Sequence, residues 1–273
     1  RPVATISNGQ VPTTAYDASG RMLATTVYGK SLTEGQQALL GSTPTLSELM
    51  AYLTPGPNNR TNLTIYDAQG NPVAVVSATS SYDSVAGEWV YGGEVVLQSF
   101  DSAGNVTAVT HYATPLTPEQ MMALGQAPTL AELDAMLAPA AGDRTSLTIY
   151  GTYGLVTGEV GANGVVTLNV YDDWGDLLAT THYATPLTEA QISALGTSPT
   201  LDALQAVVVP GPADITSLSI YDENGNVVGS VDTSGHVTTT TYDDAGDVLA
   251  TVNYATALTA AQVAALGQAP TLA

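Results

Sequence analysis

The stretch LSIYDENGNVVGSVDTSGHVTTTTYDDAGDVLATVNY (218–254) decides the fold of this chain. Apolar and β-branched residues alternate with polar ones along it, which is the period of half-buried β-strands. The alternation breaks at 222–225, 232–235 and 243–246, and each break begins with Asp and ends with Gly. Asp accepts hydrogen bonds from the turn backbone, and Gly supplies the positive φ of a type I turn with a G1 bulge. The stretch therefore predicts four short antiparallel strands in a meander.

A helical pattern follows each set of strands. In YATPLTEAQISALGTSPTL (183–201), Thr188 and Gln191 have the spacing of a capping box. Gly196 stands where a left-handed residue ends a helix of barely two turns. A second helix begins at Pro-Thr-Leu (199–201). Each unit is therefore predicted to be α+β: a four-stranded antiparallel β-meander plus two short helices, with both helices covering one face of the sheet.

The unit recurs as a tandem repeat array. Tyr171 and Tyr242 are 71 positions apart, as are Phe100 and Tyr171, whereas Tyr16 and Phe100 are 84 apart, so one unit carries 13 extra residues within 74–99. The period predicts four segments, which are a partial repeat lacking its first strand (1–62), a repeat with the insertion (63–146), a repeat (147–217) and a partial repeat lacking most of its second helix (218–273).

A unit of this size is only marginally stable by itself, so contacts between neighbours are expected to stabilise it. We predict a string of such units, each passing its terminal strand into the next. Whether the units are linked in one long chain or by strand exchange between subunits stays open. The insertion is expected to extend a hairpin or to project as an ornament.

Composition narrows the function classes. The chain has 5 Lys plus Arg against 25 Asp plus Glu and a net charge of −20, which disfavours nucleic acid as a partner. It has no apolar run long enough for membrane insertion. His111 and His182 occupy a position where the other copies have Val27 and Asn253, which argues against a catalytic role. Because no Cys and no G-x-S-x-G sequence is present either, we expect no enzyme and no obligatory cofactor.

The sequence motif Tyr-Asp-x-x-Gly-Asn/Asp, which spans the end of a strand and the following turn, resembles that of a known family. It occurs as YDAQGN (66–71), YDDWGD (171–176), YDENGN (221–226) and YDDAGD (242–247). These segments resemble the YD repeats of RHS-type bacterial surface and toxin-shell proteins, in the β half of each unit only. The resemblance implies a bacterial origin and an extracellular or cell-surface location. Because helices interrupt every four strands, a string of units is expected rather than a closed shell.

The turns offer a candidate calcium site. Ca²⁺ takes six to eight oxygen ligands, and these acidic turns hold several oxygens each. The alternative is that each Asp caps its own turn. The candidate ligands are Asp172, Asp176, Asp222, Asn224, Asn226, Asp243 and Asp247.

The insertion offers a second candidate, a glycan-binding surface formed by Tyr82, Trp89 and Tyr91. Exposed aromatic rings near acids can hold sugars, and the alternative is local packing.

Together these patterns predict a structural repeat segment of a long extracellular bacterial adhesin, stalk or filament. It would supply length and inter-unit assembly, with neighbouring repeats or identical subunits as partners. The alternative is a Ca-dependent or glycan-binding surface module.

Overall fold

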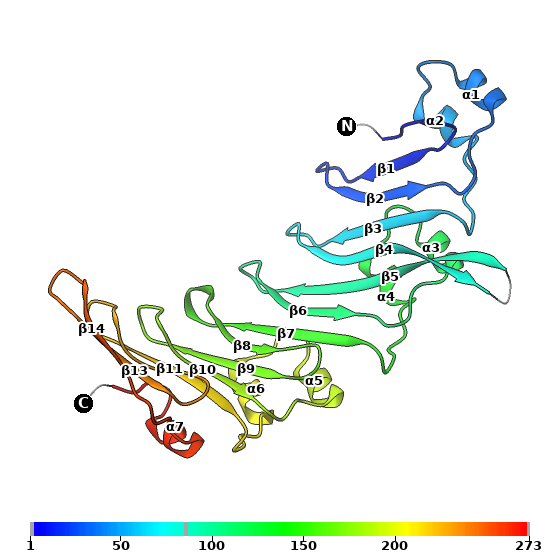
Figure 1. Ribbon diagram of the computed structural model, residues 1–273. Helices are drawn as coiled ribbons and strands as arrows, with labels where there is room; N and C mark the ends of the chain where they lie inside the picture. The colour runs from blue at the N-terminus through cyan, green and yellow to red at the C-terminus, as the bar shows by residue number, and fades with distance from the viewer. Residues whose placement is uncertain (1–2, 85–86, 272–273) are drawn as a thin grey trace. The chain divides into compact units, whose positions relative to one another are not determined.

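The computed structural model describes residues 3–84 and 87–271. Over these residues the chain is mostly β, and its strands follow one another in chain order in a 14-stranded antiparallel sheet (Figure 1). The strands are β1 (Pro12–Tyr16), β2 (Met22–Val27), β3 (Arg60–Tyr66), β4 (Pro72–Asp83), β5 (Glu88–Phe100), β6 (Val106–His111), β7 (Arg144–Tyr150), β8 (Val156–Val160), β9 (Val166–Tyr171), β10 (Leu177–Tyr183), β11 (Ile215–Tyr221), β12 (Val227–Val231), β13 (Val237–Tyr242) and β14 (Val248–Asn253).

Short helices interrupt the strands at regular intervals. Among the described residues, none of them has the length and hydropathy that crossing a bilayer requires. The chain divides into two compact units, unit 1 (Arg1–Gln98 and Val109–Arg144) and unit 2 (Ser99–Ala108 and Thr145–Ala273). The helices are α1 (Glu34–Leu40), α2 (Leu46–Met50), α3 (Pro118–Leu124), α4 (Leu130–Asp134), the 3₁₀ turn η1 (Thr152–Gly154), α5 (Glu189–Leu195), α6 (Leu201–Val207) and α7 (Ala260–Leu266).

The predicted β-rich fold is correct, but the predicted array of four-stranded meanders is wrong, because the strands form a larger antiparallel sheet. The meander connections and the paired short helices are present, but the last strand of one repeat hydrogen-bonds to the first strand of the next. In unit 1, Ala24 of β2 pairs with Leu63 of β3, and in unit 2, Ala179 of β10 pairs with Leu218 of β11. The physical reason is that a free edge between repeats would leave a row of unpaired N–H and C=O groups.

The predicted Asp-x-x-Gly turns are confirmed. In the turn after β11, the Asp222 N–H donates to the Asn226 carbonyl at 2.9 Å, and Gly225 has a φ of +82°. The strand register shifts by one residue at Tyr221, as a bulge requires. The same hydrogen bonds and register shift recur in the turn after β13, at Asp243 and Tyr242.

The predicted capping boxes are also confirmed, whereas the helix ends differ from the prediction. Gly196 has a φ of 71° and a ψ of −165°, which is an extended Gly conformation and not a left-handed one. The cap of the next helix, α6, follows four residues later at Thr200. The second helix of a pair can be very short, since α4 begins at Leu130 and ends at Asp134. The boxes are Thr33/Gln36, Thr45/Glu48, Thr117/Gln120, Thr129/Glu132, Thr188/Gln191 and Thr259/Gln262.

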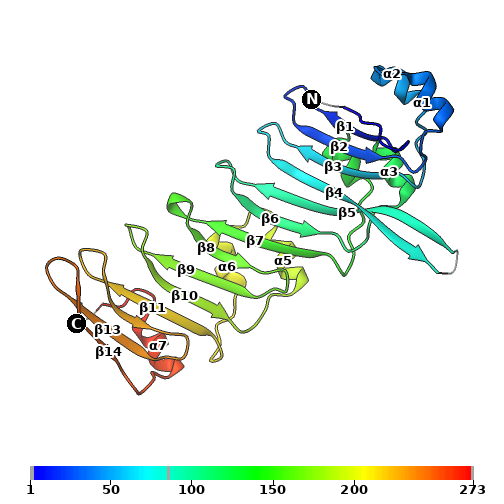
Figure 2. The same cartoon turned by 45° about the horizontal axis from the view of Figure 1, so that its top comes forward.

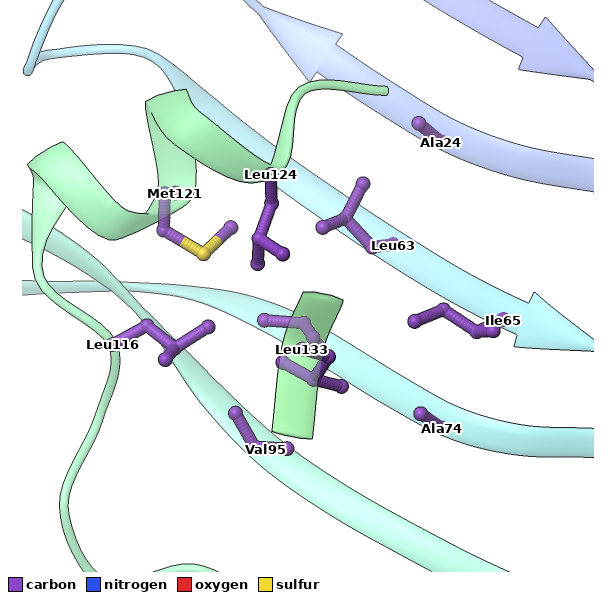
Figure 3. Close-up of a cluster of buried hydrophobic side chains, with 10 residues drawn as sticks. Ala24, Leu63, Ile65, Ala74, Val95, Leu116, Met121, Leu124 and Leu133 are labelled. Carbon is purple, nitrogen blue, oxygen red and sulfur yellow. The ribbon is translucent and has the colours of Figure 1, made fainter. Parts of the chain in front are cut away.

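The core of unit 1 lies between the α3–α4 pair and the strands β2 to β5. Figure 3 shows Met121 and Leu124 of α3 and Leu133 of α4 close to Leu63 and the neighbouring strand residues. Leu133 is fully buried. Ala24, which belongs to the preceding repeat, is part of the same cluster. The helix pair therefore covers a strand of the previous repeat as well as its own strands.

Unit 2 is built in the same way, with its helices on one face of its strands (Figures 1 and 2). Leu204 of α6 is fully buried in a cluster with Leu147, Val160 and Val166 of β7, β8 and β9. Val263 of α7 packs in a separate cluster with Ala179, Leu218 and Val231. Short helices that could not persist by themselves are thus held by the apolar face of the sheet.

The insertion extends one hairpin, which is one of the two forms expected for it. β4 and β5 have 12 and 13 residues, whereas β1, β2 and β3 have 5, 6 and 7. Their pairing runs without interruption from Ala74↔Leu97 to Asp83↔Glu88. We call residues 77–84 and 87–92 the arm; β4 and β5 project past the neighbouring strands there in Figure 2.

Candidate functional site

The most strongly built sites in this chain are the joints between consecutive repeats. A joint is defined here as the last strand of one repeat, the first strand of the next, and the helices above them. We describe the β2–β3 joint of unit 1 and the β10–β11 joint of unit 2. Because the two lie in different units and share the same contacts, they are independent examples of one design.

A small residue lies at the centre of each joint. Ala24 and Ala179 occupy equivalent positions and are both 2% exposed. They pair across the strands with Leu63 and Leu218, which are also buried. Alanine leaves room for the larger side chains that reach over it from the facing strand and the helices.

A pair of threonines forms the polar contact of each joint. The Oγ1 atoms of Thr26 and Thr61 are 3.0 Å apart, and those of Thr181 and Thr216 are also 3.0 Å apart. In unit 1 the Gln126 side chain donates to Thr26 Oγ1 at 3.1 Å. Because these hydroxyls are largely removed from water, their mutual hydrogen bond offsets the cost of burial.

A third contact fixes the chain where it leaves the last strand. In unit 2, Asp214 accepts from the Ala184 N–H at 2.9 Å and from the Gly211 N–H at 2.7 Å. In unit 1, Asn59 accepts from the Gly29 N–H at 3.0 Å. Burial, and then the nearby Asp214 carboxylate, raises the pKa of Tyr183 in the same region. In both joints, a side chain that precedes the first strand of the new repeat thus accepts a hydrogen bond from the backbone that follows the last strand of the previous repeat.

The fourth contact joins each helical segment to a turn of its own repeat. The Leu187 N–H donates to the Gly164 carbonyl at 2.8 Å, and Leu258 and Gly235 repeat this contact at 2.8 Å. A Cβ on Gly164 would lie 2.2 Å from the Leu187 carbonyl oxygen. Only glycine allows this close approach of the helical segment to the turn.

β14 has the sequence of a joint strand but lacks the rest of a joint among the described residues. Its residues are all exposed, including Val248 (59%) and Val252 (49%). Tyr254, which follows it, is 49% exposed, whereas the equivalent Tyr28 in unit 1 is 3% exposed. The only strand that β14 pairs with in the described part of the chain is β13.

Three of the candidate calcium ligands, Asp172, Asp222 and Asp243, accept hydrogen bonds within their own turns. Asp222 Oδ1 accepts from the Asn224 and Asn226 backbone N–H groups at 2.9 Å, and Oδ2 accepts from the Asn226 side chain at 3.0 Å. The Asn226 side-chain bond, followed by the backbone bond, lowers the pKa of Asp222. Asp172 and Asp243 each accept two backbone N–H bonds in the same manner, including those of Asp176 and Asp247.

Four of these candidates, Asp172, Asp176, Asp222 and Asn224, line one hollow in unit 2 with the exposed Trp174, whereas Asn226, Asp243 and Asp247 do not. Over the described residues no group of three or more His, Asp or Glu side chains has a metal-holding arrangement. Calcium binding therefore stays a prediction, and the geometry matches the alternative in which Asp stabilises the turn.

The structure brings the three aromatic candidates together on one face of the arm. Tyr82 pairs with Trp89, and Tyr91 lies two residues further along the same strand, so all three side chains share a face. The Tyr82 and Trp89 rings meet edge to face with centroids 5.6 Å apart. Both residues are 56% exposed, so local packing does not bury them.

The joint residues were missed as a site by sequence reasoning, although the sequence carries a signal for them. Alanine recurs in one phase of the repeat, and a threonine stands two residues later in three of the four copies. A solvent-exposed strand does not require the same small residue in every copy, so the recurring alanine indicates a packing contact. The alanines are Ala24, Ala108, Ala179 and Ala250, and the threonines are Thr26, Thr110 and Thr181, with Val252 in the fourth copy.

Comparison with known proteins supports the resemblance at one repeat. The family model described as RHS Repeat matches residues 221–259, which run from the end of β11 to the start of the α7 segment. The predicted resemblance to RHS-type YD repeats is therefore confirmed. No curated protein matches the chain.

The chain is also similar to two solved toxin assemblies. They are a crystal structure of TcdB2-TccC3-Cdc42 and a Photorhabdus luminescens Tc holotoxin pore with a mutated TccC3, each with 12% identity and a TM-score of 0.23. The similarity covers 90% of this chain and 14% of each of those chains.

Proposed function

We propose that this chain is a structural repeat segment of a long extracellular bacterial protein, an adhesin, stalk or filament. The repeats supply length, and the joints couple each repeat to the next. The partners are neighbouring repeats or identical subunits. In this proposal the chain is not an enzyme and uses no cofactor.

One observation carries the proposal: the buried core of each repeat includes an alanine from the repeat before it. Ala24 and Ala179 pack with side chains of helices that follow later in the chain, and an equivalent pair of threonines lies in each joint. A core shared in this way makes stability depend on the neighbour, which is the energetic signature of an extendable array. The RHS Repeat match at 221–259 adds the bacterial and extracellular part of the proposal.

Changing the number of repeats tests the proposal. A chain with residues 147–217 duplicated should be longer by one fixed increment in electron micrographs of single particles. Its free energy of unfolding should also rise, because one repeat and one joint have been added. A chain with the duplication that has unchanged particle length, or a lower unfolding free energy, would contradict the proposal.

A second function is supported by the arm. We propose that Tyr82, Trp89 and Tyr91 form a glycan-binding face, because two exposed rings already stand at a fixed angle. Deleting 77–89 returns the hairpin to the tight turn of the other repeats, so the fold should be kept. Glycan-array binding should be lost in this deletion and in Trp89→Ala, and kept in Trp174→Ala, a control at another exposed tryptophan. Binding that survives the deletion would contradict this function.

A further inference from the structure

The arm continues the helix-covered face of the sheet beyond the helices of unit 1. Val95 of β5 is 1% exposed on this face. A Cβ on Gly93 would lie 2.6 Å from the Met121 sulfur, so α3 still covers β5 at that point. Tyr91 and Trp89 follow on the same face, because alternate residues of a strand point to one side. Tyr91 is half-buried and Trp89 is 56% exposed, so the helical cover ends between Gly93 and Trp89.

Four side chains lie on the outer part of this face, and we call them the aromatic patch: Ser80, Tyr82, Trp89 and Tyr91. Tyr82 lies opposite Trp89, and Ser80 lies opposite Tyr91. The two pairs are about 7 Å apart along the strands, since each residue of a strand advances by about 3.3 Å. Three corners of the patch are therefore aromatic and the fourth is a hydroxyl. This combination fits a glycan chain, because aromatic rings pack against the C–H groups of a sugar ring and a hydroxyl bonds its OH groups.

The charge around the aromatic patch determines which glycans fit it. The chain has no Lys or Arg between Arg60 and Arg144, and the sequence of the arm contains two acidic residues and no basic one. Arg60 lies on the other face of the sheet, because its neighbour Thr61 is buried on the helix side. A sugar that carries a carboxylate or a sulfate would therefore meet only like charge, on a chain with a net charge of −20.

A cation is the other class of ligand that aromatic rings bind. Recognition of a cation uses the faces of several rings that surround it as a cage. The Tyr82 and Trp89 rings instead meet edge to face at 64°, so they form an open corner. Ser80 and Tyr91 continue this open surface along the arm. An open surface favours a flat sugar ring over an enclosed cation.

We propose that the aromatic patch binds an uncharged hexopyranose chain, with one sugar stacked on Trp89 and the next sugar over Tyr91. Ser80 bonds a hydroxyl of the sugar over Tyr91. This inference rests on the glycan-binding function proposed for the arm. It adds the class of glycan and the placement of two consecutive sugars.

A glycan array tests the class of ligand on the full chain. It contains pairs of glycans that share one hexopyranose chain and differ only by a sialic acid or a sulfate group. We expect the uncharged member of each bound pair to bind at least about tenfold more tightly, because the charged member faces an acidic chain. Binding of the uncharged member should be the same at low and high salt, since no charge pair is screened.

Variants of the arm locate the two sugars by NMR titration. Trp89→Ala should weaken binding of uncharged chains at least about tenfold, and Trp89→Phe, which keeps a ring beside Tyr82, should retain part of it. Tyr91→Ala should weaken a disaccharide about fivefold and leave a monosaccharide unchanged, because only the second sugar reaches it. Val90→Ala, on the opposite face of the arm, is the matched control and should leave binding unchanged. Thermal unfolding of each variant shows whether the fold is kept.

The outcomes separate this inference from the glycan-binding function on which it rests. Preferred binding of sialylated or sulfated glycans, lost in Trp89→Ala, would overturn the inference and leave the glycan-binding function intact. Preference for oligosaccharides of glucosamine with free amines over their N-acetylated forms would do the same, because the ligand would then be a cation. If no glycan binds, or if binding survives in Trp89→Ala, both the inference and the glycan-binding function fail.

Discussion

β10 and β14 have almost the same sequence and opposite environments. β10 reads LLATTHY (177–183), and β14 together with the tyrosine that follows it reads VLATVNY (248–254). Ala179 is 2% exposed beneath α7 and beside β11, whereas every residue of β14 is exposed. The difference teaches that burial of a repeat strand is decided by the module that follows it in space. The predictions below use equivalent positions of the two strands, or paired positions within one repeat.

The largest effect is expected from a charge at the equivalent alanines. Ala179→Glu buries a carboxylate among apolar side chains and should lower the free energy of unfolding of unit 2 by about 4 kcal/mol. Ala250→Glu should change it by no more than about 0.5 kcal/mol, because the residue is exposed. Urea unfolding of both variants measures the difference. Equal losses would show that β14 is covered in solution.

Removing the helix side chain over the strands should have the next largest effect. Leu204 is fully buried, so Leu204→Ala leaves a cavity between α6 and β7 to β9 and should cost about 3 kcal/mol. Leu249→Ala, at a position 67% exposed on β14, is the control and should be close to neutral. Thermal unfolding followed by circular dichroism compares the two variants. A small loss for Leu204→Ala would mean that the helices contribute little to the core.

Substitution by alanine should cost different amounts of stability at two glycines that both have a positive φ. Gly164→Ala adds a Cβ 2.2 Å from the Leu187 carbonyl oxygen as well as the cost of a φ of +81°, and should destabilise by about 2 kcal/mol. Gly225→Ala, with a φ of +82° and open space around it, should cost about 1 kcal/mol. Chemical denaturation of both variants provides the measurement. Identical costs would mean that the helical segment does not need to approach Gly164.

The smallest effect concerns pH. The pKa of Asp222 is lowered in the folded chain by bonds from Asn226, so its contribution is fully present above its ordinary value of 3.8 and is lost as pH falls through the lower folded value. Asp101, which bonds Asn105 in the same manner, follows the same direction. Asp222→Asn should therefore weaken the loss of stability below about pH 4. Unfolding curves of the variant and the parent chain from pH 2 to pH 6 check this, and parallel curves would argue against it.

Local structure was predictable because it depends on short-range chemistry. Asp222 and Gly225 are three residues apart, and a carboxylate and a positive φ close the same turn wherever they occur at that spacing. Thr188 and Gln191 cap a helix for the same reason. The extended ψ of Gly196 was not predictable, since it follows from the path to the next helix.

The candidate sites were predictable only in part. The sequence places Tyr82 and Trp89 seven residues apart, and only the pairing of β4 with β5 brings their rings together. Asp222 was expected to have free oxygens for a cation, but three N–H groups of its own turn already occupy them. Strand contact between neighbouring repeats was expected, but the joint residues were not predicted, because Thr181 and Thr216 are 35 residues apart and meet only through strand pairing.

The sequence by itself determined the repeat, the meander, the turn chemistry and the helix caps. These are contacts among residues within a few positions of one another, and their geometry does not depend on the remainder of the chain. Only the tertiary structure decided that the strands continue as a single sheet and that helices seal each strand of the preceding repeat. The reason is that β10 and β14 carry similar residues, although Ala179 is buried and Ala250 is exposed. The sequence of a strand therefore does not show whether a neighbour covers it.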